Sequence, residues 1–221
     1  MIKKALKIVL KAGGGLLLLI FIVSLVTYLF VNEPKPNGVS GDRAEQLADE
    51  MLAALNKPAY DTLAYLEFTF KGIHHYKWDR ENNRVLVNWR KNEVLLDLNL
   101  KPESYDEVET TAYKYFINDS FWLVAPFKVR DDGALRFTLD VEEGRGLLVT
   151  YTSGGVTPGD SYLWIIDDNG FPQAWKLWTS IVPIGGVEFS WENWEKLGGI
   201  HFSTLHKSSI LNLDISELVV R

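Results

Sequence analysis

The chain has 221 residues, of which 47% are hydrophobic and 24% are charged, and it contains no cysteine. This composition is typical of a globular protein and excludes wholesale disorder and collagen-like repeats. The lack of cysteine excludes disulfides, zinc–thiolate sites, thiol catalysis and the lipid-modified cysteine of a bacterial lipoprotein. A formal net charge of −6 argues against nucleic-acid binding, which needs a basic surface.

The charge is distributed unevenly along the chain. The four basic residues Lys3, Lys4, Lys7 and Lys11 all precede a run without any charge, Ala12–Val31. Residues 32–221 then contain 19 basic and 29 acidic side chains, a net charge of −10. This acidic body would repel nucleic acid and anionic lipid headgroups.

The uncharged run predicts a membrane segment. Its 20 residues would form a helix of about 30 Å, which matches the hydrocarbon thickness of a bilayer. The lysines place the N-terminus in the cytoplasm by the positive-inside rule. We therefore expect a single-pass signal anchor in the inner (cytoplasmic) membrane, with the bilayer as a partner and the rest of the chain in the periplasm or outside.

A cleaved signal peptide is the alternative, and it would leave a secreted or periplasmic protein. The apolar stretch is long for a signal peptide, and bulky residues stand where a peptidase needs small ones. The organisation expected is a basic tip and anchor over 1–31, a Pro- and Gly-containing linker over 32–41, and one extracytoplasmic domain over 42–221.

The domain begins with a predicted helix over 42–55, because apolar residues recur there at helical spacing and Asp42 with Glu45 resembles a capping box. From Leu66 the apolar period changes to two, which predicts an antiparallel meander as far as Leu98. A second helix is expected over 104–118. It should end at Asn118-Asp119-Ser120, and an apolar loop should follow over 121–127.

Further strands are expected near 134–140, 146–153, 160–167, 172–180, 186–192, 199–207 and 209–216. Asp168-Asn169-Gly170 predicts a type I′ hairpin turn, and Pro158-Gly159 a type II turn. The fold class expected is therefore mainly β (α+β). It comprises a large curved antiparallel sheet or open half-barrel of about ten strands, with roughly two or three helices on one face.

This order of elements resembles the lipoprotein-carrier (LolA/LolB-like) fold, in which an open half-barrel surrounds an apolar cavity closed by helices. Residues 162–177, with Asp167, Gly170 and Pro172, resemble the central hairpin of that superfamily. Residues 191–194 and 198–202 resemble a later passage of it. The chain departs from the soluble carrier by its expected anchor, and from the lipoprotein receptor by its lack of an acylated cysteine.

Two stretches also resemble an uncharacterised envelope-protein family of Bacteroidota-type bacteria. They are residues 118–123 and 153–162, within a resemblance that extends over roughly 42–216. No assigned function comes with this resemblance.

The polar candidates do not form a catalytic or metal-binding pattern. His74 and His75 are adjacent in a predicted strand, so their side chains should point to opposite faces, as should those of His201 and His206. Asp119-Ser120 lacks the motif of a serine hydrolase. The acidic pairs at 131–132, 142–143 and 167–168 suit solvated turns, and the glycine pairs at 154–155 and 185–186 suit bends of the sheet. We expect the protein to bind no cofactor and no metal, and not to be an enzyme.

The eight tryptophans are the compositional anomaly, since they could fill a wide core or line a pocket for an apolar ligand. The function expected is binding of a lipid, acyl chain or other apolar ligand. The alternatives are a non-catalytic envelope assembly protein with a protein partner, or a hydrolase using the same cavity. Six aromatic residues are predicted to form the apolar wall, namely Trp164, Trp175, Trp178, Phe121, Trp122 and Tyr162. Strand alternation places Trp175 and Trp178 on opposite faces, so at least one of them should not belong to it.

Overall fold

The structure of the protein is a computed structural model that describes residues 32–153, 157–182 and 184–221, together with isolated positions between 13 and 28. The expected membrane segment, Ala12–Val31, lies mostly outside the described residues, as does the basic tip. Within the part that is described, no helix is both long enough and apolar enough to span a bilayer.

The described chain is mainly β, with twelve strands in two antiparallel sheets. The seven-stranded sheet contains, in spatial order, β10 (Glu192–Leu197), β11 (Ile200–Lys207), β12 (Asn212–Val220), β1 (Tyr65–Phe70), β2 (His74–Asp79), β3 (Arg84–Trp89) and β4 (Asn92–Asp97). The five-stranded sheet contains β5 (Ala134–Leu139), β6 (Arg145–Tyr151), β7 (Ser161–Ile166), β8 (Pro172–Trp178) and β9 (Val187–Ser190). Nearly every pair of neighbours is consecutive in the chain, as a meander requires. The exception is β1 with β12, where Thr69 lies opposite Ser216.

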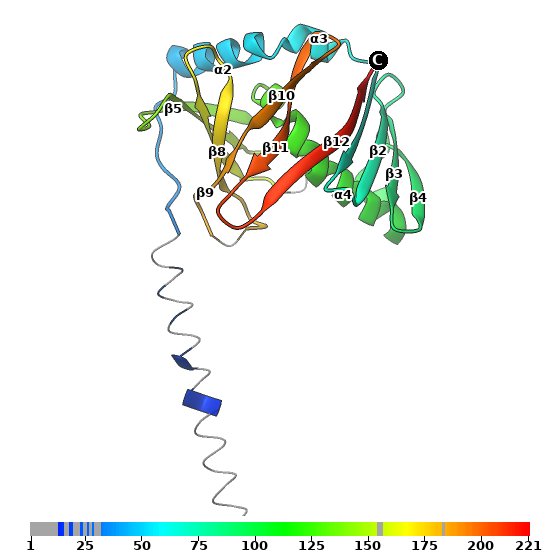
Figure 1. The fold of residues 1–221 in the computed structure, drawn as a ribbon, viewed down its shortest axis with the longest axis horizontal. Helices are drawn as coiled ribbons and strands as arrows, with labels where there is room; N and C mark the ends of the chain where they lie inside the picture. Colours follow the sequence, from blue (N-terminus) through cyan, green and yellow to red (C-terminus); the bar gives the residue numbers. More distant parts are fainter. Residues whose placement is uncertain are drawn as a thin grey trace, which may run out of the picture.

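Three α-helices accompany the sheets in the described domain, namely α2 (Asp42–Ala54), α3 (Lys57–Asp61) and α4 (Glu107–Val124), and α4 is flanked by the 3-10 helices η1 (Pro102–Ser104) and η2 (Ala125–Lys128). Figure 1 shows α2 and α3 across one end of the strands, whereas α4 lies against the sheets themselves. One hydrophobic cluster joins α2, α4 and both sheets. The two sheets therefore share a core.

The helix expected over 42–55 is confirmed as α2, and the apolar residues at its predicted core positions are buried. Its predicted capping box is absent, because Gly41 is the N-cap and no side chain bonds there. Among the helices of the described domain, a capping box is present at α4. There the Asp106 carboxylate accepts from the backbone N–H of Glu109, and the Glu109 side chain accepts from the N–H of Asp106.

The prediction that the second helix ends at Asn118 is wrong. Helix α4 continues to Val124 and passes directly into η2, so the apolar loop expected over 121–127 is helical. Asp119 does not cap the helix, because its carboxylate is buried and accepts a hydrogen bond from the Tyr76 hydroxyl at 2.6 Å. Pro126 is compatible with this geometry because it lies in the first turn of η2, where no N–H is needed.

The later strands also differ in detail from the prediction. The strand expected over 186–192 is divided at Trp191. The backbone N–H of Trp191 donates to the Gln173 carbonyl at 2.7 Å. The chain then enters β10, which was not predicted as a separate strand. The strand expected over 209–216 begins later, as β12.

The turn before β8 is not type I′, since Gly170 alone of its central residues has positive φ. The type II turn at Pro158-Gly159 is confirmed by φ of +102° at Gly159 and by the bond from the Asp160 N–H to the Thr157 carbonyl.

The segment 32–41 lies on the five-stranded sheet. Val39 forms an isolated bridge with Thr138 of β5, and the Glu33 N–H donates to the Gly185 carbonyl at 3.0 Å. In Figure 1 this segment runs along the sheet from the end opposite α2 to the start of α2.

Candidate functional site

A cavity of about 450 Å³ lies between α4 and the five-stranded sheet. This volume falls within the range of about 300–1,000 Å³ that is usual for small-molecule sites. Side chains of successive turns of α4 form one wall, and side chains of β6, β7 and β8 form the other. The lining residues of these two walls are Tyr113, Phe116, Ile117, Asn118, Ser120, Phe121 and Trp122 on α4, and Tyr151, Tyr162, Trp175 and Leu177 on the strands. Trp78 of β2 and Leu98, which follows β4, also line the cavity.

The two walls meet through aromatic contacts. The Phe121 ring lies 5.1 Å from that of Tyr162 and 5.9 Å from that of Trp175, and Trp122 lies 5.1 Å from Trp175. Tyr162 stacks on Trp175 at 4.8 Å. Because rigid aromatic rings support one another on both sides, the apolar surface of the cavity is held in place without a ligand.

The hydroxyl groups of the strand wall are uncharged at neutral pH. Burial, with the Asp131 carboxylate as the next contribution, raises the pKa of Tyr151 well above its ordinary value of 10. Burial likewise raises the pKa of Tyr162, and the Asp160 carboxylate adds to the effect. The two tyrosines therefore add no charge to the aromatic strand wall.

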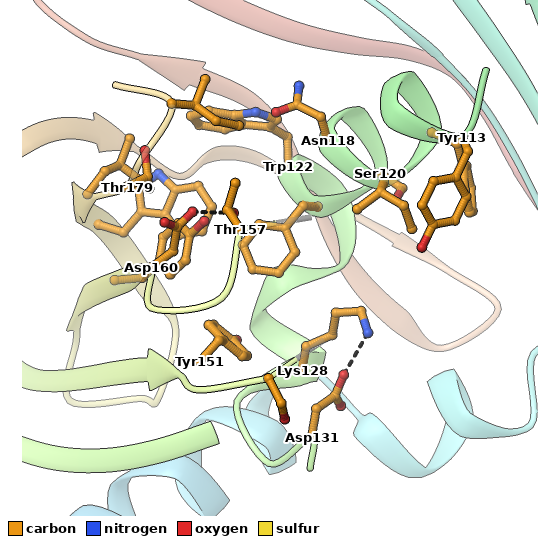
Figure 2. A pocket seen from close by; sticks show the side chains of 18 of the residues that line it. Tyr113, Asn118, Ser120, Trp122, Lys128, Asp131, Tyr151, Thr157, Asp160 and Thr179 are labelled. Carbon is orange, nitrogen blue, oxygen red and sulfur yellow. Dashed lines mark hydrogen bonds and ion pairs between the residues drawn. The ribbon is translucent and has the colours of Figure 1, made fainter. Parts of the chain in front are cut away.

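Charged and polar side chains line the cavity beside the aromatic rings, and Figure 2 labels several of them. Lys128 and Asp131 form an ion pair of 2.6 Å. The Asp160 carboxylate accepts from the Thr157 hydroxyl at 2.5 Å and from the Ser180 N–H at 2.9 Å. Asp160 thus joins the β6–β7 connection to the β8–β9 connection beside the cavity.

Four of the six predicted wall residues line the cavity, namely Phe121, Trp122, Tyr162 and Trp175. Trp164 does not line it, because it is fully buried behind Trp175 and in contact with Trp191. Trp178 does not line it either. It lies on the other face of β8, where its indole N–H donates to the Glu33 carbonyl at 2.8 Å, as the alternation of strand residues requires.

The prediction missed several lining residues. Ile117 and Tyr113 lie four and eight positions before Phe121, on one face of α4, and they would have been found if the helix had been extended. Tyr151 lies two residues after Val149, which pairs with Tyr162 across β6 and β7. The period of two would have placed it on the same face.

Asp119 and Ser120 serve different parts of the molecule. The Asp119 carboxylate is bound by Tyr76 and by Nδ1 of His74, each at 2.6 Å, on the seven-stranded sheet. Ser120 instead lines the cavity. The adjacent His75 lies on the opposite face from His74, with Nε2 at 3.1 Å from Glu67.

The remaining polar candidates have structural partners. His201 stacks on Phe171 at 5.2 Å, and His206 is buried beside Trp191. Asp167 accepts from the N–H groups of Asn169 and Phe171 within its turn. In the described ranges no group of three or more His, Cys, Asp or Glu side chains could hold a metal ion.

No family model matches this chain, and no curated protein matches it. Among solved structures, it is similar to a DUF1329 family protein from Desulfovibrio piger, with 9% sequence identity and a TM-score of 0.40, over 81% of this chain and 94% of that one. The expected relation to a Bacteroidota-type envelope family stays a prediction.

Proposed function

We propose that this protein is a membrane-anchored extracytoplasmic binding protein for a lipid, acyl chain or other apolar ligand, and that the cavity between α4 and the five-stranded sheet is its binding site. In this proposal the two sheets act as the open, lipoprotein-carrier-like half-barrel expected from the element order, with α4 on the inner side. The anchor is the uncharged run Ala12–Val31.

The observation that carries the proposal is the cavity between two packed aromatic walls. An assembly protein that used only its outer surface would need no such space, and a sheet packed on helices normally leaves none. A hydrolase would need polar groups that converge on a substrate. Here the Lys128 ammonium is paired with Asp131, and the Asp160 carboxylate accepts from Thr157 and Ser180.

Acyl-chain burial can supply the required binding free energy without a catalytic group. Burial of about ten methylene groups at roughly 0.8 kcal/mol each contributes roughly 8 kcal/mol before the entropic cost of association. Because the aromatic walls are already packed against each other, little further ordering is needed when a ligand enters.

The experiment uses the full chain in lipid vesicles that contain a phospholipid with a photoreactive diazirine in its acyl chain. After irradiation, peptide mass spectrometry should find adducts on peptides of α4, β7 and β8, which contain Phe121, Tyr162 and Trp175 respectively. Adducts on the anchor peptide serve as the internal standard for the photoreaction.

Two tryptophan substitutions on α4 provide the matched comparison. Ile117→Trp places a bulky indole ring in the cavity and should reduce the wall adducts severalfold, while Lys114→Trp adds the same ring to an exposed position outside the lining. Lys114→Trp should leave the adducts unchanged. Labelling of the anchor without labelling of the cavity walls would overturn the proposed function.

A further inference from the structure

We propose that the end of the domain that carries Ile181 and Ile210 docks directly on the lipid bilayer, so that the cavity opens at the membrane surface. This inference rests on the anchor in the proposed function. It does not depend on which ligand occupies the cavity.

The first argument is the place where the chain enters the domain. The Asn32 side-chain oxygen accepts from the Gly185 N–H at 2.8 Å, the Glu33 N–H donates to the Gly185 carbonyl at 3.0 Å, and Trp178 donates to the Glu33 carbonyl. The contact is close, since a Cβ at position 185 would lie 2.6 Å from the Glu33 carbonyl oxygen.

This attachment leaves almost no free chain between bilayer and domain. Val31 is the last residue of the uncharged run, and two residues later Glu33 is already fixed on the domain. Two extended residues span at most about 7 Å. A helix that crosses the bilayer over Ala12–Val31 must therefore end beside the β8–β9 connection, and it brings this end of the domain to the membrane surface.

The second argument is the exposed apolar side chains at the same end. Ile181 in the β8–β9 connection is 61% exposed, and Ile210 in the β11–β12 turn is 76% exposed. Figure 1 shows these two connections at the end where residues 32–35 begin, opposite α2 and α3. Large aliphatic side chains in this position would gain free energy by entering the boundary between headgroups and acyl chains.

The third argument is the position of the cavity opening. Asp160, Thr179 and Val182 line the cavity and also line the surface groove beneath residues 32–35. The cavity therefore opens next to the segment that follows the anchor. An acyl chain that moved from the bilayer through this opening would avoid exposing its methylene groups to water, at about 0.8 kcal/mol each.

The experiment exploits the absence of native cysteine. Single variants Ile181→Cys, Ile210→Cys and Leu100→Cys of the full chain carry the same maleimide dye, and each is reconstituted into nanodiscs with and without nitroxide-labelled phospholipid. Leu100 is the matched control, because it is also exposed, at 53%, but lies elsewhere. It follows β4 at the end of the sheet where the Leu98 N–H donates to the carbonyl of Asn83, the residue before β3.

We expect the nitroxide lipid to quench roughly half of the dye fluorescence at positions 181 and 210 and to leave position 100 almost unchanged, since quenching requires the dye to lie within the interfacial layer. Equal quenching at all three positions, or none at any of them, in protein that is retained in the nanodiscs would overturn the docking inference alone. Failure of the chain to enter the nanodiscs would overturn the anchor and, with it, the inference.

Discussion

At the scale of single residues, His206 is a titratable group whose pKa is lowered by the fold. It is fully buried, its ring lies 4.3 Å from that of Trp191 and 5.5 Å from that of Trp122, and Nδ1 is 3.2 Å from the Ser190 carbonyl oxygen. Burial lowers the pKa of His206 from 6.5 to about 4. The imidazole is therefore neutral in the folded protein at pH values where it would already be charged in the unfolded chain.

This shift predicts a loss of stability in acid. Between pH 6.5 and 4 the unfolded chain binds the His206 proton and the folded protein does not, so the contribution of His206 is complete above pH 6.5 and is lost as the pH falls toward 4. The loss should reach about 3 kcal/mol. It is measured by urea unfolding of the full chain in mild detergent, followed by tryptophan fluorescence at pH 7 and pH 4.

The variant His206→Gln should lose about 3 kcal/mol less than the parent over that interval, because glutamine does not titrate there. His201→Gln, at a half-buried position of the same strand, should change the pH dependence less. An identical loss in the His206→Gln variant and the parent would contradict the assignment.

For other single residues, the local sequence pattern predicts the position of some side chains but not of others. The period of two is sufficient to separate Trp175 from Trp178, because it is a property of one strand. The role of Asp119 is set by Tyr76, which lies 43 positions away in the chain, and no local pattern contains that partner. For the same reason Trp164 could not be told from a wall residue, since what covers it is Trp175 on one side and Trp191 on the other.

At the scale of elements, Asp160 holds together two connections at the edge of the cavity. It is 5% exposed, and its carboxylate accepts from the Ser180 N–H and from the Thr157 hydroxyl. The variant Asp160→Ala removes both bonds, and each such bond to a charged group contributes roughly 1.5–3 kcal/mol. Opening of the β8–β9 connection should become more frequent by about tenfold or more.

The measurement is amide hydrogen exchange of the full chain, followed by mass spectrometry. Peptides that contain Ser180 should exchange faster in Asp160→Ala, while peptides of α2 should be unchanged. Asp168→Ala, at an exposed turn position, is the matched control and should exchange like the parent. Unaltered exchange around Ser180 would show that Asp160 does not hold this connection.

The elements themselves were predictable where periodicity alone decides them. Helix α2 and the hairpins from β1 to β4 follow from local apolar spacing. The end of α4 was missed because Asn, Asp and Ser usually favour caps, and here tertiary contacts outweighed that preference. The break between β9 and β10 was missed because it depends on the bond between Trp191 and Gln173 of another strand.

At the scale of the whole molecule, sequential hairpins explain most of the sheet topology but not the pairing of β1 with β12. The first strand pairs with the last, Leu66 opposite Val220, across nearly the full length of the domain. Such a pairing has no local signal. The division into two sheets has none either, and the structure has twelve strands in two sheets where the sequence predicted one curved sheet or open half-barrel of about ten strands. The cavity is also a property of the whole molecule, since α4 and the β6–β8 wall come from separate parts of the chain.

The whole-molecule distribution of charge and apolar residues leads to the last prediction. Four lysines, an uncharged run and an acidic body with a net charge of −10 follow one another, which is the order expected for a single crossing with the body outside. The full chain should stay in the membrane fraction after high-salt and alkaline washes, at its complete mass of 25.2 kDa.

Leu19→Arg, near the centre of the run, should reduce insertion by about 3 kcal/mol, although the long apolar run can offset part of this cost. Ser40→Arg adds the same charge beyond the run and should remain fully in the membrane fraction. Recovery of a soluble, shortened protein that begins near residue 32 would instead establish the cleaved signal peptide and would also remove the basis for docking on the bilayer.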